Sequence, residues 1–197
     1  EDHGIGIQPD RMNKIFLNYG ASTKRDSNDL IGGLGLGAKT PFAYSDTFTV
    51  LTVCNWKKKR MKYVYTATIS DQSGYGRGEM ILFVEEETTE PTGTKIIIPI
   101  KKTDKSLFEI ETIRTTSLWK VLPELINFEE DYEDYPIETI KETEEFKVIK
   151  DEQGLFYNSY IISIDGVPYP VDNSIMKFNQ NFLNSSYFRT VFNFKTG

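Results

Sequence analysis

Glycines between residues 30 and 42 form the stretch of this sequence best suited to chemistry. Four glycines, at positions 32, 33, 35 and 37, lie within six residues, and a short run of helical character follows. Glycine allows positive φ angles and lets the backbone come close to a ligand. Unpaired amides at the start of a helix favour anions. The loop is a candidate phosphate cradle, and a tight glycine turn at a domain edge is the alternative.

Two well-known phosphate loops do not fit these residues. A P-loop requires Lys directly after its last Gly. Gly32 and Gly37 have the right separation, but Ala38 separates Gly37 from Lys39. The dinucleotide fingerprint G-x-G-x-x-G also fails, because residues 33–37 read G-x-G-x-G. The neighbouring segments must therefore explain the loop.

A second motif, Asp2-x-Gly4-x-Gly6, opens the chain. An ionised Asp accepts a hydrogen bond from an amino group, and glycines let a flat ring approach the backbone. An ordinary Asx turn is the alternative. The first residue is Glu1 and not Met, so we expect a fragment whose natural start is not included.

Composition and charge narrow the class of protein. The net charge of −6 and the pI near 5.0 argue against a nucleic-acid groove, which needs a basic face. The single Cys54 excludes an intrachain disulfide and a cysteine zinc site, and the single His3 excludes a site of several histidines. The sequence shows no apolar run of membrane-spanning length and no signal peptide, which predicts a cytoplasmic setting.

The elements around both motifs can be predicted from apolar periodicity. A helix is expected at residues 9–19, and the polar segment 21–29 that follows is either a nucleotide lid or a surface loop. Runs rich in β-branched and aromatic residues then predict an antiparallel meander. Its strands are expected at residues 47–54, 61–70, 80–86 and 94–100. A second helix is expected at residues 103–122.

An acidic stretch at residues 129–145 is the candidate boundary between two domains. We expect a first domain at residues 1–122, a solvated linker or excursion at 123–145, and the start of a second β-rich domain at 146–197. Within this second domain, strands are predicted at residues 146–150 and 155–165. The aromatic residues near the end of the chain would form a core element or a partner surface.

The order of these motifs resembles a known family. Asp2-x-Gly4-x-Gly6, a helix, a polar segment, Gly33-x-Gly35-x-Gly37, strands and then Gly93-Thr94 follow one another. This order is similar to the ATP-binding domain shared by gyrase B, the heat-shock-ninety chaperones, histidine kinases and MutL, the GHKL superfamily. The resemblance covers residues 1–122 and implies an α/β (α+β) two-layer sandwich. Its sheet would be mixed and mostly antiparallel, and a second β-rich domain would follow.

A closer likeness is to the phage rIIA-like proteins. Residues 31–48, which read IGGLGLGAKTPFAYSDTF, resemble their signature almost letter for letter. Residues 92–94 and 96–99 fit the same proteins, as do 154–156 and 166–170 in the second half. The likeness implies a phage protein and, with it, the cytoplasm of an infected host cell.

The GHKL resemblance implies ATP as the cofactor, with its base near the start of the chain. Asp2 would accept a hydrogen bond from the adenine amino group, Gly6 would line the base, and Gly4 of the same motif would belong to the cofactor site. Thr94 would bond close to Asp2 through a bridging water. On the phosphate side, the backbone amides of Gly33, Gly35 and Gly37 would wrap the phosphates. Ser22 and Lys24 would contact them from the lid. Lys39 would contribute its positive charge, and a purely structural role for Lys39 is the alternative.

One part of the family pattern has no counterpart here. The family carries a Glu that activates water and an Asn that holds magnesium, both on a helix before the Asp motif, and nothing precedes Glu1 in this sequence. Phosphoryl transfer depends on such groups. Catalytic and metal-binding residues are therefore not assigned, and magnesium and ATPase activity are expected only in the intact protein.

The expected function is ATP binding, with slow hydrolysis driving a lid or dimer rearrangement in the intact protein. A second copy of the chain is thus a candidate partner. The alternative is a non-hydrolysing nucleotide-binding module or a structural scaffold. A P-loop-like phosphotransferase is disfavoured by Ala38 and by the order of the strands.

Overall fold

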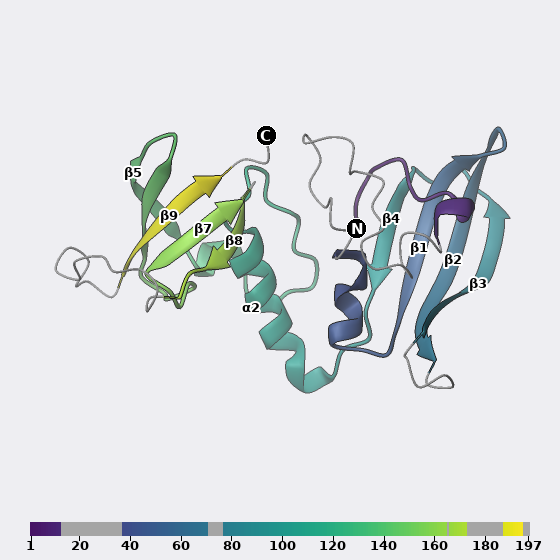
Figure 1. Cartoon of the computed structure of the whole chain (residues 1–197), viewed down its shortest axis with the longest axis horizontal. Helices are drawn as coiled ribbons and strands as arrows, with labels where there is room; N and C mark the ends of the chain where they lie inside the picture. The colour runs from purple at the N-terminus through teal and green to yellow at the C-terminus, as the bar shows by residue number, and fades with distance from the viewer. Residues whose placement is uncertain (13–36, 71–76, 165, 173–186, 195–197) are drawn as a thin grey trace. The chain divides into compact units, whose positions relative to one another are not determined.

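Strands are the commonest regular secondary structure in the computed structural model, which describes residues 1–12, 37–70, 77–164, 166–172 and 187–194 (Figure 1). The chain divides into two units, Glu1–Ile100 and Lys101–Gly197, and each contains its own sheet and its own apolar core. The sequence predicted an α/β (α+β) sandwich followed by a β-rich domain, and the described residues are mostly β with two sheets. The GHKL-type sandwich stays a prediction, because the expected helix at residues 9–19 and the glycine loop lie largely outside the described residues.

The first unit contains a four-stranded antiparallel sheet in the order β3-β2-β1-β4. Its strands are β1 (Thr47–Trp56), β2 (Lys59–Ser70), β3 (Arg77–Glu87) and β4 (Gly93–Ile97). The predicted meander is correct for β1, β2 and β3. The fourth strand lies beside β1 and not beside β3, with Val53 opposite Gly93 and Thr49 opposite Ile97. The meander prediction is therefore wrong for the fourth strand, because alternation predicts the faces of a strand but not its neighbour.

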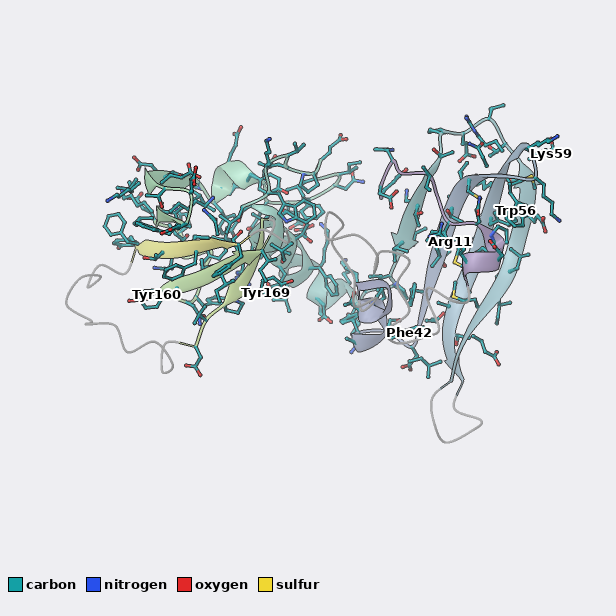
Figure 2. All side chains as sticks on the ribbon, turned by 45° about the horizontal axis from the view of Figure 1, so that its top comes forward. Arg11, Phe42, Trp56, Lys59, Tyr160 and Tyr169 are labelled. Carbon is teal, nitrogen blue, oxygen red and sulfur yellow. The ribbon has the colours of Figure 1, made fainter. Side chains whose placement is uncertain are left out.

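Alternation along β1 builds the first core. Phe48, Val50 and Cys54 are buried, and Tyr63, Tyr65 and Ala67 of β2 join them with Met12. Residues 9–12 are helical, as predicted for this part of the expected helix. The 3₁₀ helix η1 (Gly37–Ala43) follows the glycine loop, as expected, and carries Phe42 (Figure 2). Phe42 packs edge-on against Phe48, with ring centroids 4.7 Å apart.

The second unit contains a five-stranded sheet in the order β5-β6-β9-β7-β8. Neighbouring strands are antiparallel except β7 and β9, which are parallel. The elements are η3 (Lys102–Asp104), α2 (Lys105–Thr116), η4 (Tyr132–Asp134), β5 (Ile137–Glu142), β6 (Phe146–Asp151), β7 (Tyr160–Ile164), β8 (Val167–Pro170) and β9 (Phe188–Phe194). Within the described ranges, no helix combines the length and apolar character needed to cross a bilayer.

The structure differs from the sequence-based domain assignment in this region. Helix α2 is shorter than the expected 103–122, and it belongs to the second unit because Ile113 packs with Ile149, Leu155 and Val191. The acidic stretch contains strand β5, which pairs with β6 although most of its side chains are exposed. The strand expected at 155–165 begins only at Tyr160. Residues 155–158 form a loop instead, in which the amides of Leu155 and Phe156 donate to the Asp151 carboxylate.

Candidate functional site

The start of the chain lies along the outer edge of β4. The amide of Asp2 donates to the carbonyl of Thr94 (N···O 2.9 Å), and the amide of Thr94 donates back to the carbonyl of Asp2 (3.3 Å). Gly93 makes this approach feasible, since a Cβ there would lie 2.2 Å from the Asp2 carbonyl oxygen. Two residues far apart in the sequence are thereby held side by side.

The carboxylate of Asp2 is exposed and oriented by its own turn. Its Oδ1 accepts a hydrogen bond from the amide of Gly4 at 2.8 Å. This is the Asx turn that the sequence left open as an alternative. Among the described residues, Oδ2 has no hydrogen-bond partner. The turn therefore fixes one oxygen and leaves the other as an acceptor.

Thr52 connects the two chain segments, and sequence reasoning missed it. Its side chain is fully buried. Its hydroxyl accepts from the amide of Ile7 at 2.8 Å and lies 3.2 Å from the Gly93 carbonyl and 3.4 Å from the Thr94 hydroxyl. Because a hydroxyl carries a single proton, it donates to one of these two oxygens at a time. The sequence does contain a sign of this role. In the alternating pattern of β1, Thr52 falls on the face that is otherwise apolar.

Gly6 must be glycine because of its backbone conformation and its close approach to strand β1. Its φ is 73°, and a Cβ at this position would lie 2.1 Å from the carbonyl oxygen of Val53 and 2.9 Å from the Cβ of Cys54. Its close approach is thus to strand β1. Burial raises the pKa of the adjacent Cys54 thiol, and the negative charge of Asp10 raises it further. Cys54 is therefore an inert thiol beneath the site.

The structure brings four of the predicted residues together, namely Asp2, Gly4, Gly6 and Thr94. The phosphate side of the prediction is largely outside the described residues, which include neither Ser22 and Lys24 nor Gly33 and Gly35. Gly37 is described as the first residue of η1, and Lys39 lies on the same helix, with its side chain outside the description.

Three solved structures resemble this chain. The ATPase region of Saccharomyces cerevisiae topoisomerase II has a TM-score of 0.46 and 16% identity, over 84% of this chain and 51% of that one. The ATPase domain of Aquifex aeolicus MutL has a TM-score of 0.42 and 11% identity, over 98% and 75% of the two chains. A single-residue variant of that MutL domain has a TM-score of 0.41 and 12% identity, over 98% and 76%.

The chain thus spans about half the length of the topoisomerase II chain that it matches, at 51%. With TM-scores below 0.5, no residue role is transferred from these structures. No protein-family model matches the sequence, and no curated protein matches it either.

Proposed function

We propose that this chain binds ATP, with the adenine base at Asp2 and with Gly4, Gly6 and Thr94 around it. The observation that supports this is the exposed Asp2 carboxylate on a residue whose backbone pairs with Thr94. Its Oδ1 accepts from the Gly4 amide, and its Oδ2 has no partner among the described residues. An ionised carboxylate accepts a hydrogen bond from the amino group of adenine. Guanine presents a carbonyl oxygen at the same ring position, which the carboxylate would repel.

The phosphate side of the proposal rests on the sequence motif. Backbone amides of Gly33, Gly35 and Gly37 would hold the phosphates, because glycines leave amides accessible to an anion. Ser22 and Lys24 would contact the outer phosphate from a lid, and Lys39 would add a positive charge. Magnesium bound to ATP would supply charge neutralisation at the phosphates.

The finer proposal concerns the intact protein. It would hydrolyse ATP slowly and use the bound nucleotide to rearrange a lid or a homodimer, and it would be a phage rIIA-like protein. The likeness of residues 31–48 to the rIIA-like signature supports this assignment. Hydrolysis would require a general base and a magnesium ligand, for which this chain has no assigned residues.

Titration calorimetry with ATP and GTP tests the proposal. Asp2→Asn keeps the Oδ1 acceptor for Gly4 but places an amide donor against the adenine amino group. Losing a charge-assisted hydrogen bond costs about 1.5–3 kcal/mol, so the Kd for ATP should rise about tenfold or more. Asp46→Asn, a carboxylate change elsewhere in the first unit, should leave the Kd unchanged. Equal affinity for ATP and GTP, or an Asp2→Asn variant that binds ATP normally, would refute the proposal.

A structural scaffold is the second candidate, and specific observations favour it. The Asx turn at Asp2 and the close approaches at Gly6 and Gly93 are each explained by contacts within the protein. A scaffold would show no saturable heat with ATP, while Asp2→Ala would still lower the free energy of unfolding through loss of the turn. Calorimetry and urea unfolding of the same variants separate the two candidates.

A further inference from the structure

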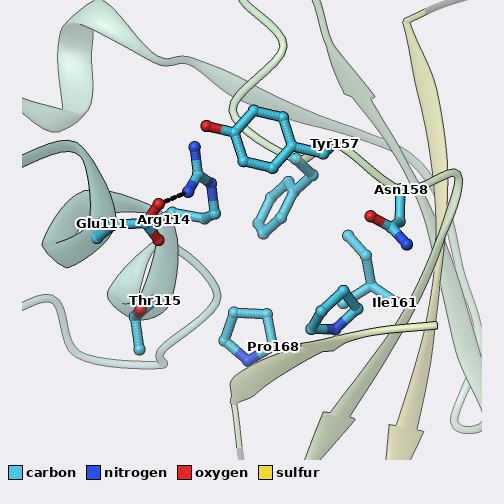
Figure 3. Close-up of a pocket in the computed structure, with 9 residues that line it drawn as sticks. Glu111, Arg114, Thr115, Tyr157, Asn158, Ile161 and Pro168 are labelled. Atoms are coloured by element: carbon cyan, nitrogen blue, oxygen red, sulfur yellow. Dashed lines mark hydrogen bonds and ion pairs between the residues drawn. The ribbon is translucent and has the colours of Figure 1, made fainter. Parts of the chain in front are cut away.

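A cavity of about 250 Å³ lies within the second unit, between helix α2, the loop before β7 and strand β8 (Figure 3). Its apolar lining comes from Phe156, Ile161, Pro168 and Pro170. An apolar cavity of about 150 Å³ is enough to hold benzene, and drug-sized ligands occupy about 300 Å³ or more. The space therefore suits a ligand of one or two fused rings.

A buried ion pair holds the loop that lines this cavity. Asp151 is 1% exposed and accepts from the amide of Leu155 at 2.8 Å and from the amide of Phe156 at 2.9 Å. Arg189 lies 3.5 Å from the Asp151 carboxylate and donates from Nε to the carbonyl of Phe156 at 2.9 Å. Because both backbone polar groups of Phe156 are fixed, the wall is preformed and a ligand would not have to order it.

The one cation among the lining residues is already balanced. Arg114 forms an ion pair with Glu111 and donates from Nε to the carbonyl of Leu155. The ring of Tyr157 lies over its guanidinium, 4.1 Å from Cζ to the ring centroid. The lining therefore carries no net charge, and a ligand carboxylate would meet Glu111. An uncharged ligand fits this lining better than an anion does.

Asn158 supplies a directed hydrogen-bond acceptor. Its Nδ2 donates to the carbonyl of Val171 at 2.7 Å, which orients the amide. Figure 3 shows its Oδ1 turned toward the cavity and Nδ2 turned away. Among the described residues, Oδ1 has no hydrogen-bond partner. A ligand that enters the cavity can satisfy this oxygen only with a donor.

We propose that this cavity is a binding site for an uncharged aromatic ring that carries one N–H or O–H donor. The ring packs against Phe156, Ile161 and the two prolines, and its donor bonds Oδ1 of Asn158. Such a ring can belong to a free small molecule or to a tryptophan side chain of a partner. Indole is the probe for the first source, and N-acetyltryptophanamide is the probe for the second.

Ligand-induced NMR shifts of the full chain test the site. Indole should produce saturable shifts among residues 111–115, 156–161 and 168–170. Blocking the ring N–H with a methyl group, as in 1-methylindole, removes the donor and should raise the Kd about three- to tenfold. The anionic indole-3-acetate should also bind more weakly than indole. A side-chain source predicts binding of N-acetyltryptophanamide as well, whereas a free small molecule predicts binding of indole alone, and both results support the site.

Two variants make the test specific. Thr115 is exposed at the rim of the cavity, so Thr115→Trp should fill the space without loss of folding and should abolish indole binding. Asn158→Ala should remove the preference for indole over 1-methylindole. Absence of saturable indole binding, or indole binding that survives Thr115→Trp, would overturn the site. Equal Kd values for indole and 1-methylindole in the unmodified chain would overturn the role of Asn158.

Discussion

Replacing Thr52 by valine would remove one hydroxyl from the centre of the first unit and keep the branched shape of the side chain. The amide of Ile7 and the carbonyl of Gly93 would lose a partner that now lies at 2.8 Å and 3.2 Å. Leaving such groups unsatisfied costs about 1–3 kcal/mol, and the added buried methyl group returns less than about 1 kcal/mol. We expect the free energy of unfolding of the first unit to fall by about 1–2 kcal/mol.

The two tryptophans allow each unit to be followed separately, because Trp56 lies in the first unit and Trp119 in the second. In a Trp119→Phe background, urea unfolding monitored by fluorescence reports the first unit. Thr49→Val is the matched control. Thr49 is a half-buried threonine on the same strand, and among the described residues its side chain has no hydrogen-bond partner.

The same variant also tests how the candidate site is held together. When residue 52 lacks a hydroxyl, the amide of Ile7 loses its hydrogen bond to β1. The start of the chain is then attached less firmly, and Asp2 is held less well beside Thr94. We therefore expect Thr52→Val to raise the Kd for ATP, measured in the absence of urea. If Thr52→Val and Thr49→Val unfold at the same urea concentration, the reasoning about the buried hydroxyl is wrong.

Three further predictions follow from the glycines, the core and the buried ion pair. Gly6 and Gly154 both have φ near +70°, but only at Gly6 would a Cβ collide with backbone. In urea unfolding, Gly6→Ala should therefore lower the free energy of unfolding by about 2–5 kcal/mol, and Gly154→Ala by only about 1–2 kcal/mol. Burial raises the pKa of Tyr65 from 10.0 to about 12, so its contribution to stability is complete below pH 10 and disappears as the pH rises through about 12. Tyr65→Phe should therefore flatten the decline of the free energy of unfolding between these pH values. Asp151→Asn should destabilise the second unit by about 3–5 kcal/mol, monitored through its tryptophan, because Arg189 loses its buried carboxylate partner; an unchanged urea midpoint would contradict this.

Part of the candidate site was accessible from the sequence. The motif order pointed to Asp2, Gly4, Gly6 and Thr94, and the structure places these four close together, while their roles toward ATP stay predictions. Thr52 was missed because a threonine within a strand belongs to no recognisable motif. Its role depends on three groups, at Ile7, Gly93 and Thr94, that only the folded chain brings to one point.

What the sequence determined by itself is local. Alternation of apolar and polar residues predicted the strands, and turn residues between β1, β2 and β3 predicted their hairpins, because both depend on near neighbours. Tertiary structure decided the placement of β4 beside β1, the inclusion of α2 in the second core and the parallel pairing of β7 with β9. Such pairings join segments that are distant in the sequence, and the packing of whole faces selects them. The pattern within any one segment is compatible with more than one neighbour.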